Sequence, residues 1–232
     1  MLAGLRHRGR RRAVAEFIRS GSGPLVDYYR DPVAVDHDAP WRAASYLVVE
    51  VESTDPDPRE GEPRSVGWMC VEGGVVVTGS AQHHIIDSEA DAEAGAEAHA
   101  GGPAVDVVAD LLNELRGRVL VCHAAERSIG VLSTVCRRQW GLDLWPWQLV
   151  DPMQWHRDRS RRFRPGAPAP ETQLPVLLDR YGLPPPTRTQ EALSEAFGTA
   201  LLFLAMAEQP GRNDNGGPRR LGDLLDSRSW TM

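Results

Sequence analysis

The pattern of apolar and polar positions predicts three strands in the first half of the chain. Tyr46–Val51 is an apolar run with one acidic break, and Val66–Val71 is a second run of strand length. A third strand begins at Val75, directly after the pair Gly73-Gly74, which is typical of a hairpin turn. The last two of these strands are therefore expected to pair as a hairpin.

Helical spacing of apolar residues dominates the rest of the chain. It predicts helices over Ala104–Leu115, Ile129–Trp140, Glu171–Tyr181 and Glu191–Ala207, of which the last is the longest and most apolar. Between the first two helices, the short apolar run Val119–Cys122 predicts a buried strand. This order of elements predicts an α/β fold in which a mixed sheet is flanked by helices.

Composition distinguishes three further segments. Residues 1–44 are predicted to form a basic N-terminal arm, either a solvated extension or a contact for nucleic acid or a protein partner. Residues 156–170 are rich in Arg and Pro and predict a loop. Residues 209–232 predict a flexible C-terminal tail. The predicted organisation is thus an arm, one domain over residues 45–208, and a tail.

Charge is distributed unevenly along the chain. Residues 1–42 carry eight Arg against five acidic residues, whereas residues 43–208 carry 14 Arg against 24 acidic residues. The acidic centre argues against a protein that holds nucleic acid by bulk charge alone. The three cysteines have no paired metal spacing, and no apolar run approaches the ~20 residues that span a bilayer. These features predict a cytoplasmic protein with free thiols and no membrane partner.

Two acidic side chains near the end of the first strand are candidates for a metal site. Glu50 and Glu52 are two positions apart, so in a strand both point to the same face. Neighbouring carboxylates repel each other unless a cation lies between them, which is the arrangement of many metal sites. The competing interpretation is an exposed Glu-x-Glu pair on the surface of a sheet.

Three short segments carry polar residues in a characteristic order. They are Glu50-Val51-Glu52-Ser53-Thr54, then His123-Ala124-Ala125-Glu126-Arg127-Ser128 after a strand, then Gln190-Glu191-Ala192-Leu193-Ser194-Glu195-Ala196 at the start of a helix. Over about residues 45–208 the chain resembles the DnaQ-like (DEDD) 3′–5′ exonucleases. Their motifs are Asp-x-Glu-Thr-Thr, His-Asn-x-x-Phe-Asp and His-x-Ala-x-x-Asp-Ala. The resemblance implies a ribonuclease H-like fold.

The same resemblance implies an activity and a set of site residues. The family hydrolyses phosphodiesters at a 3′ end with two Mg²⁺ or Mn²⁺ ions held by four carboxylates, and a His acts as general base. By position, Glu50, Glu52 and Glu195 are carboxylate ligands in this chain. Ser128 stands where the second-motif Asp belongs, and Gln190 stands where the His belongs.

Two of these substitutions predict that catalysis is weakened or lost. Ser128 removes a negative charge from the metal site. The Gln190 amide cannot accept a proton near neutral pH, so the general-base contribution, typically about 10²–10⁴-fold, is absent. Glu126 is a candidate for the missing carboxylate, although a solvent-facing Glu at a helix start is the competing interpretation. The expected cofactor is therefore Mg²⁺ or Mn²⁺, or no metal at all.

Five arginines form the densest positive run of the predicted domain. Phosphate contact and a solvated loop that balances the acidic centre are both consistent with this run. By the resemblance, the expected partner is the 3′ end of single-stranded nucleic acid. The residues concerned are Arg157, Arg159, Arg161, Arg162 and Arg164.

Three hypotheses of function follow from the sequence. The first is an exonuclease-fold protein that binds nucleic acid and has weak or no catalysis. The second is an active nuclease whose rearranged site is built from Glu50, Glu52, Glu126 and Glu195. The third is a non-catalytic module that binds a protein partner through its terminal segments.

Overall fold

A five-stranded mixed sheet forms the centre of the computed structural model, which describes residues 2–87, 102–163, 168–186, 191–209 and 219–225. Its strand order is β3-β2-β1-β4-β5. The strands are β1 (Tyr46–Ser53), β2 (Pro63–Glu72), β3 (Val75–Ile85), β4 (Val119–Val121) and β5 (Leu149–Val150). β1, β2 and β3 pair antiparallel, whereas β1, β4 and β5 pair parallel.

The predicted α/β architecture is confirmed. The hairpin, the buried strand β4 and the helix α4 (Ala104–Leu115) lie where the apolar pattern places them. β2 and β3 are longer than predicted, and the two-residue strand β5 was not predicted at all. A strand of two residues is too short to produce a period in the sequence.

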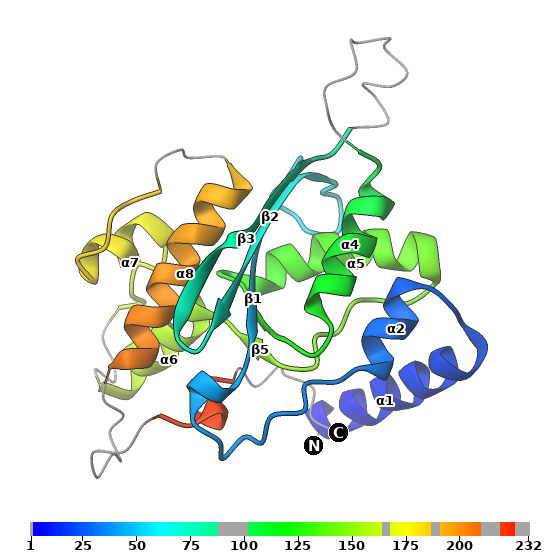
Figure 1. The fold of residues 1–232 in the computed structure, drawn as a ribbon, viewed down its shortest axis with the longest axis horizontal. Helices are drawn as coiled ribbons and strands as arrows, with labels where there is room; N and C mark the ends of the chain where they lie inside the picture. The colour runs from blue at the N-terminus through cyan, green and yellow to red at the C-terminus, as the bar shows by residue number, and fades with distance from the viewer. Residues whose placement is uncertain (1, 88–101, 164–167, 187–190, 210–218, 226–232) are drawn as a thin grey trace.

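The two faces of the sheet carry separate hydrophobic cores. Leu47, Val49 and Val51 of β1 pack with α4 and with α5 (Ala125–Trp140). The alternate residues Tyr46 and Val48 point to the other face and pack with α8 (Ala192–Glu208). Figure 1 shows α4 and α5 on one side of the sheet and α8 on the other. Because side chains alternate along a strand, Glu50 and Glu52 point towards α8.

Helix α8 crosses the sheet in close contact with β2. A β-carbon at Gly67 would overlap the backbone of Ala192 and Leu193, so the first turn of α8 lies directly on this glycine. Gly67 is paired with Glu50 across the sheet, and with His83 on the other side. The missing side chain therefore brings the start of α8 close to the end of β1.

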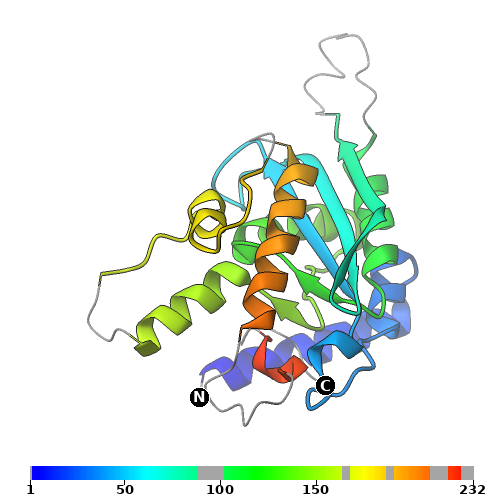
Figure 2. The ribbon, with the colours of Figure 1, turned by 60° about the vertical axis from the view of Figure 1, so that its left-hand side comes forward.

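The Arg- and Pro-rich segment that was predicted as a loop is helical over residues 156–163, so the prediction is wrong for that part. Residues Pro152–Phe163 form α6, and α7 follows over Leu174–Arg180. Pro152 occupies the first helical position, where proline is favoured, and Arg is a good helix former. The composition of residues 156–170 obscured these local preferences. Figure 2 shows α6 and α7 beside α8.

Both terminal segments contribute to the folded body. The helices α1 (Leu2–Ser20) and α2 (Pro24–Arg30) precede the sheet, and α2 buries Leu25, Val26, Tyr28 and Tyr29. The Tyr28 hydroxyl accepts a hydrogen bond from the Trp147 backbone N–H at 2.8 Å. Near the other end, Leu221 is buried, and its N–H donates to the Ala39 carbonyl at 2.9 Å. The predicted flexible tail lies largely outside the described residues.

Two further observations concern the cysteines and the apolar character of the helices. Cys70, Cys122 and Cys136 are all buried, and none of the three forms a disulfide, as predicted. Within the described part of the chain, none of the helices combines the length and apolar character needed to cross a bilayer.

Candidate functional site

The carboxyl group of Glu50 is buried at the contact between β1, α8 and the start of α5. Its side chain is 6% exposed. Oε1 accepts a hydrogen bond from the His123 backbone N–H at 2.9 Å and another from the Thr199 hydroxyl at 2.8 Å. Burial raises the pKa of Glu50 to about 8, and the charges of Glu195 and Asp151 act in the same direction. Near neutral pH this group is therefore mainly a neutral acid.

Glu52 lies on the same face of β1 and is more exposed than Glu50. Its Oε2 accepts a hydrogen bond of 2.6 Å from the hydroxyl of Ser65, the residue opposite it on β2. A register shift between Glu52 and Ser53 follows directly. Glu52 is therefore held at the rim of the site rather than within it.

Asp151 is a buried site residue that the sequence analysis missed. It follows β5 directly and is 1% exposed. Its two carboxylate oxygens accept from four backbone N–H groups: those of Ala124 (3.2 Å), Ala125 (3.0 Å), Met153 (3.0 Å) and Gln154 (3.3 Å). Asp151 thus starts α6 as an N-cap residue and also fixes the start of α5. An Asp between an apolar run and a Pro is the sequence signal that could have identified it.

The turn into α5 presents three consecutive backbone N–H groups to these two carboxyl groups. His123 donates to Glu50, and the next two residues donate to Asp151. Ala124 has a φ of 54°, which is uncommon for a residue with a side chain. Left-handed backbone of this kind costs about 1–2 kcal/mol and is retained where surrounding contacts enforce it. Glu50 and Asp151 therefore act together to hold the turn.

The other predicted ligands occupy different environments. Ser128 is buried within α5 and is 4% exposed. Glu126, in the first turn of the same helix, is exposed to solvent. Glu195 lies in the first turn of α8, close enough for its charge to raise the Glu50 pKa. Gln190 lies outside the described residues. The structure thus brings Glu50, Glu195 and Asp151 together, and it leaves Glu126 on the surface.

The residues present do not fit a pair of divalent cations. Glu50 Oε1 already accepts from two donors, and both Asp151 oxygens accept from backbone N–H groups. Ser128 contributes no charge. Across the described ranges, no group of three or more His, Cys, Asp or Glu side chains is arranged to hold a metal ion. No catalytic step through such ions follows from this arrangement.

His123 forms hydrogen bonds through both its ring and its backbone. Its Nε2 lies 2.8 Å from the Thr172 carbonyl oxygen. Burial lowers the pKa of His123, so the ring is mainly neutral at neutral pH. Its ring therefore tethers the segment before α7, while its backbone N–H binds Glu50.

His83 and His84 are half-buried residues of β3. The His84 ring stacks on Trp68 with centroids 4.6 Å apart. The His83 Nδ1 lies 4.0 Å from a Glu191 carboxylate oxygen. Both Nε2 atoms are buried.

The arginines of the run contact different parts of the protein. Arg157 donates to the Thr172 hydroxyl at 3.4 Å, and Arg159 donates to the Gln209 side-chain oxygen at 2.6 Å. Arg161 lies 3.9 Å from Asp158, and Arg162 is exposed. Arg164 lies outside the described part. The helix therefore distributes these charges over more than one surface.

Solved exonuclease structures share this fold. E. coli exonuclease I in a zinc-bound complex with single-stranded DNA is 16% identical to this chain, with a TM-score of 0.57 over 70% of this chain and 40% of that one. Exonuclease I of Methylocaldum szegediense is 15% identical, with a TM-score of 0.55 over 73% and 41%. Cell-death related nuclease 4 is 10% identical, with a TM-score of 0.53 over 70% and 63%.

These similarities establish the fold. The chain is similar in fold to part of exonuclease I, and it spans about two fifths of the length of that protein. No protein-family model and no curated protein matches the sequence. The expected ribonuclease H-like architecture is therefore confirmed at the level of the fold.

Proposed function

We propose that this protein binds single-stranded nucleic acid through an exonuclease fold and hydrolyses it weakly or not at all. Two observations support strand binding. The fold is similar to that of exonuclease I, which has been solved with single-stranded DNA. Helix α6 carries four arginines of the run, between Arg157 and Arg162, at about 9–17 Å along its axis from Asp151, at the rise of a standard helix.

The environment of Glu50 carries the proposal that catalysis is weakened or lost. A metal ligand at this position must be ionised and must present its oxygens to the ion. Glu50 Oε1 instead accepts hydrogen bonds from the His123 N–H and the Thr199 hydroxyl. Glu52 remains the more accessible carboxylate of the strand. A single accessible carboxylate does not provide enough ligands to hold and orient two metal ions.

A digestion assay tests this function. We expect a 5′-labelled single strand to bind in Mn²⁺ and to be shortened from its 3′ end at least about 100-fold more slowly than by exonuclease I in parallel, since general-base help of that order is absent. The control is Glu52→Gln, which should leave the residual rate unchanged. Rapid Mn²⁺-dependent digestion that Glu52→Gln abolishes would overturn the proposal in favour of a rearranged active site.

A further inference from the structure

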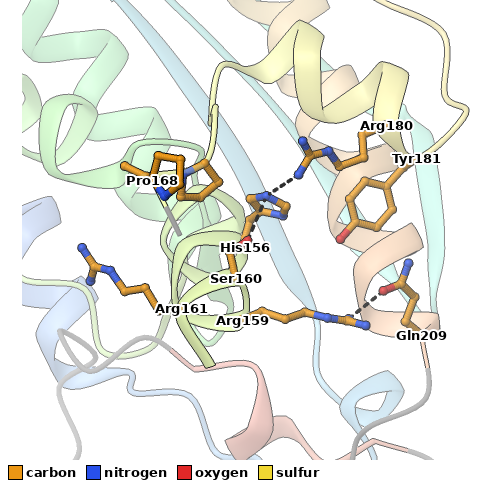
Figure 3. Close-up of a pocket in the computed structure, with 10 residues that line it drawn as sticks. His156, Arg159, Ser160, Arg161, Pro168, Arg180, Tyr181 and Gln209 are labelled. Carbon is orange, nitrogen blue, oxygen red and sulfur yellow. Dashed lines mark hydrogen bonds between the residues drawn. The ribbon is translucent and has the colours of Figure 1, made fainter. Parts of the chain in front are cut away.

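A cleft of about 1050 Å³ lies between α6, the segment before α7, and the C-terminal end of α8 (Figure 3). It begins roughly 8 Å along α6 from Asp151, at His156, by the rise of a standard helix. Glu195 and Gln209 lie at opposite ends of α8, about 20 Å apart along its axis. The cleft is therefore a neighbour of the carboxylate cluster and is distinct from it.

The residues that line this cleft are rich in positive charge. Arg159, Arg161 and Arg180 line it, and none of the ten lining residues is acidic. In Figure 3 the side chains of Arg159 and Arg180 lie on the same side of α6 as Tyr181, whereas Arg161 points away from them. Arg161 also lies 3.9 Å from Asp158. The positive charge that faces Tyr181 therefore comes from Arg159 and Arg180.

Arg180 is held by a partner that does not neutralise it. Its Nη1 donates to His156 Nε2 at 3.1 Å, and the Ser160 hydroxyl lies 3.4 Å from the same nitrogen. Burial lowers the pKa of His156, and the charges of Arg180 and Arg159 lower it further. A neutral imidazole orients the guanidinium and leaves its positive charge uncompensated by this contact.

The chemistry of the cleft fits one class of ligand. Guanidinium groups bind phosphate oxygens through parallel N–H donors. Tyr181 adds an aromatic ring, on which a base can stack. Gln209 adds a side-chain amide, which Arg159 contacts. The volume is near the upper end of small-molecule sites and exceeds that of an isolated phosphate.

We infer that this cleft binds a nucleotide unit, with Arg180 and Arg159 contacting its phosphate and Tyr181 its base. The unit is supplied either by a single strand whose 3′ end lies at the carboxylate cluster or by a free nucleotide. In the first case the inference deepens the proposed function and rests on it. In the second case it stands independently.

Binding to the full chain in EDTA tests the cleft separately from the carboxylates. The probes are thymidine 5′-monophosphate and a short fluorescein-labelled oligothymidylate. We expect Arg180→Met, which keeps an unbranched apolar stem and removes the guanidinium charge, to weaken binding of at least one probe about tenfold or more. Arg116→Met, at an exposed arginine that follows α4, should change affinity by less than about twofold. Because Arg180 contacts a buried His, Arg159→Met provides a second variant, and unfolding curves confirm that each protein is folded.

The outcomes separate the two proposals. Weakening of the monophosphate identifies a free-nucleotide site, and weakening of the oligonucleotide alone identifies a strand site. If binding of both probes survives both Arg180→Met and Arg159→Met, the cleft is overturned, and strand binding by the same proteins leaves the proposed function intact. Monophosphate binding that needs Arg180, without any strand binding, would support the cleft and contradict the proposed function. If polyglutamate displaced the probes as well as a nucleotide does, the cleft could not be a nucleotide site.

Discussion

Replacing Glu50 with Gln is expected to raise the free energy of unfolding by roughly 2–4 kcal/mol at pH 8 and by less than about 1 kcal/mol at pH 5. The fold does not need an anion at this position, because the side-chain oxygen of a glutamine can accept the same bonds from the His123 N–H and the Thr199 hydroxyl. Urea unfolding of both proteins across this pH range measures the effect.

The direction of this effect follows from the raised pKa. Between pH 4.5 and about 8 the folded protein binds a proton at Glu50 that the unfolded chain has released. The contribution of protonated Glu50 to the free energy of unfolding of the wild-type protein is therefore fully present below about pH 4.5 and is lost as the pH rises towards 8. The full pKa shift of Glu50 corresponds to about 5 kcal/mol in the free energy of unfolding, and structural relaxation around the ionised carboxylate reduces this value. A difference between the two proteins that is independent of pH would contradict this interpretation.

Replacing Asp151 with Ala is expected to lower the free energy of unfolding by about 3–5 kcal/mol. Four backbone N–H groups lose their acceptor, at the start of α5 and at the start of α6. The turn at Ala124, with its positive φ, loses one of the two groups that hold it. Urea unfolding gives the total cost, and faster hydrogen exchange at Ala124 and Ala125 would localise it.

A matched control for this variant lies on the same helix. Asp158 is exposed on α6, and its carboxylate contacts Gln154 and Arg161. Asp158→Ala is expected to change stability by no more than about 0.5 kcal/mol, as is usual at exposed sites. If Asp151→Ala were as mild as this control, Asp151 could not be the residue that organises both helix starts.

The apolar pattern was sufficient to predict β1 to β4 and the helices α4, α5, α7 and α8, because burial imposes a period on the sequence. Val119–Val121 and the stripe of α4 are read directly from that period. β5 and α6 were missed for different reasons. β5 has only two residues, and α6 is a polar helix whose arginines and flanking prolines outweigh its few apolar positions. A very short strand and a polar helix leave no apolar period in the sequence, although strand pairing and helix capping stabilise them.

The candidate site was less predictable than the fold. A motif gives the residue types at its positions, but it does not give the groups that surround their side chains. The sequence places Glu50 and Glu195 correctly on the elements that meet. It does not show that Thr199, two turns into α8 on a face buried against the sheet, donates to Glu50. Nor does it show that Asp151 occupies the space beside them. These partners come from distant parts of the chain and determine the protonation of the carboxyl group.

The protonation state of Glu50 tests the central claim most directly. Carbon-13 NMR of the side-chain carboxyl, assigned by its loss in Glu50→Gln, can follow its titration with and without millimolar Mg²⁺. The account predicts a midpoint near pH 8 that Mg²⁺ leaves in place, because Oε1 is bound to the His123 N–H and the Thr199 hydroxyl. A midpoint below pH 5, or one that Mg²⁺ lowers by several units, would show an ionised ligand and contradict the claim.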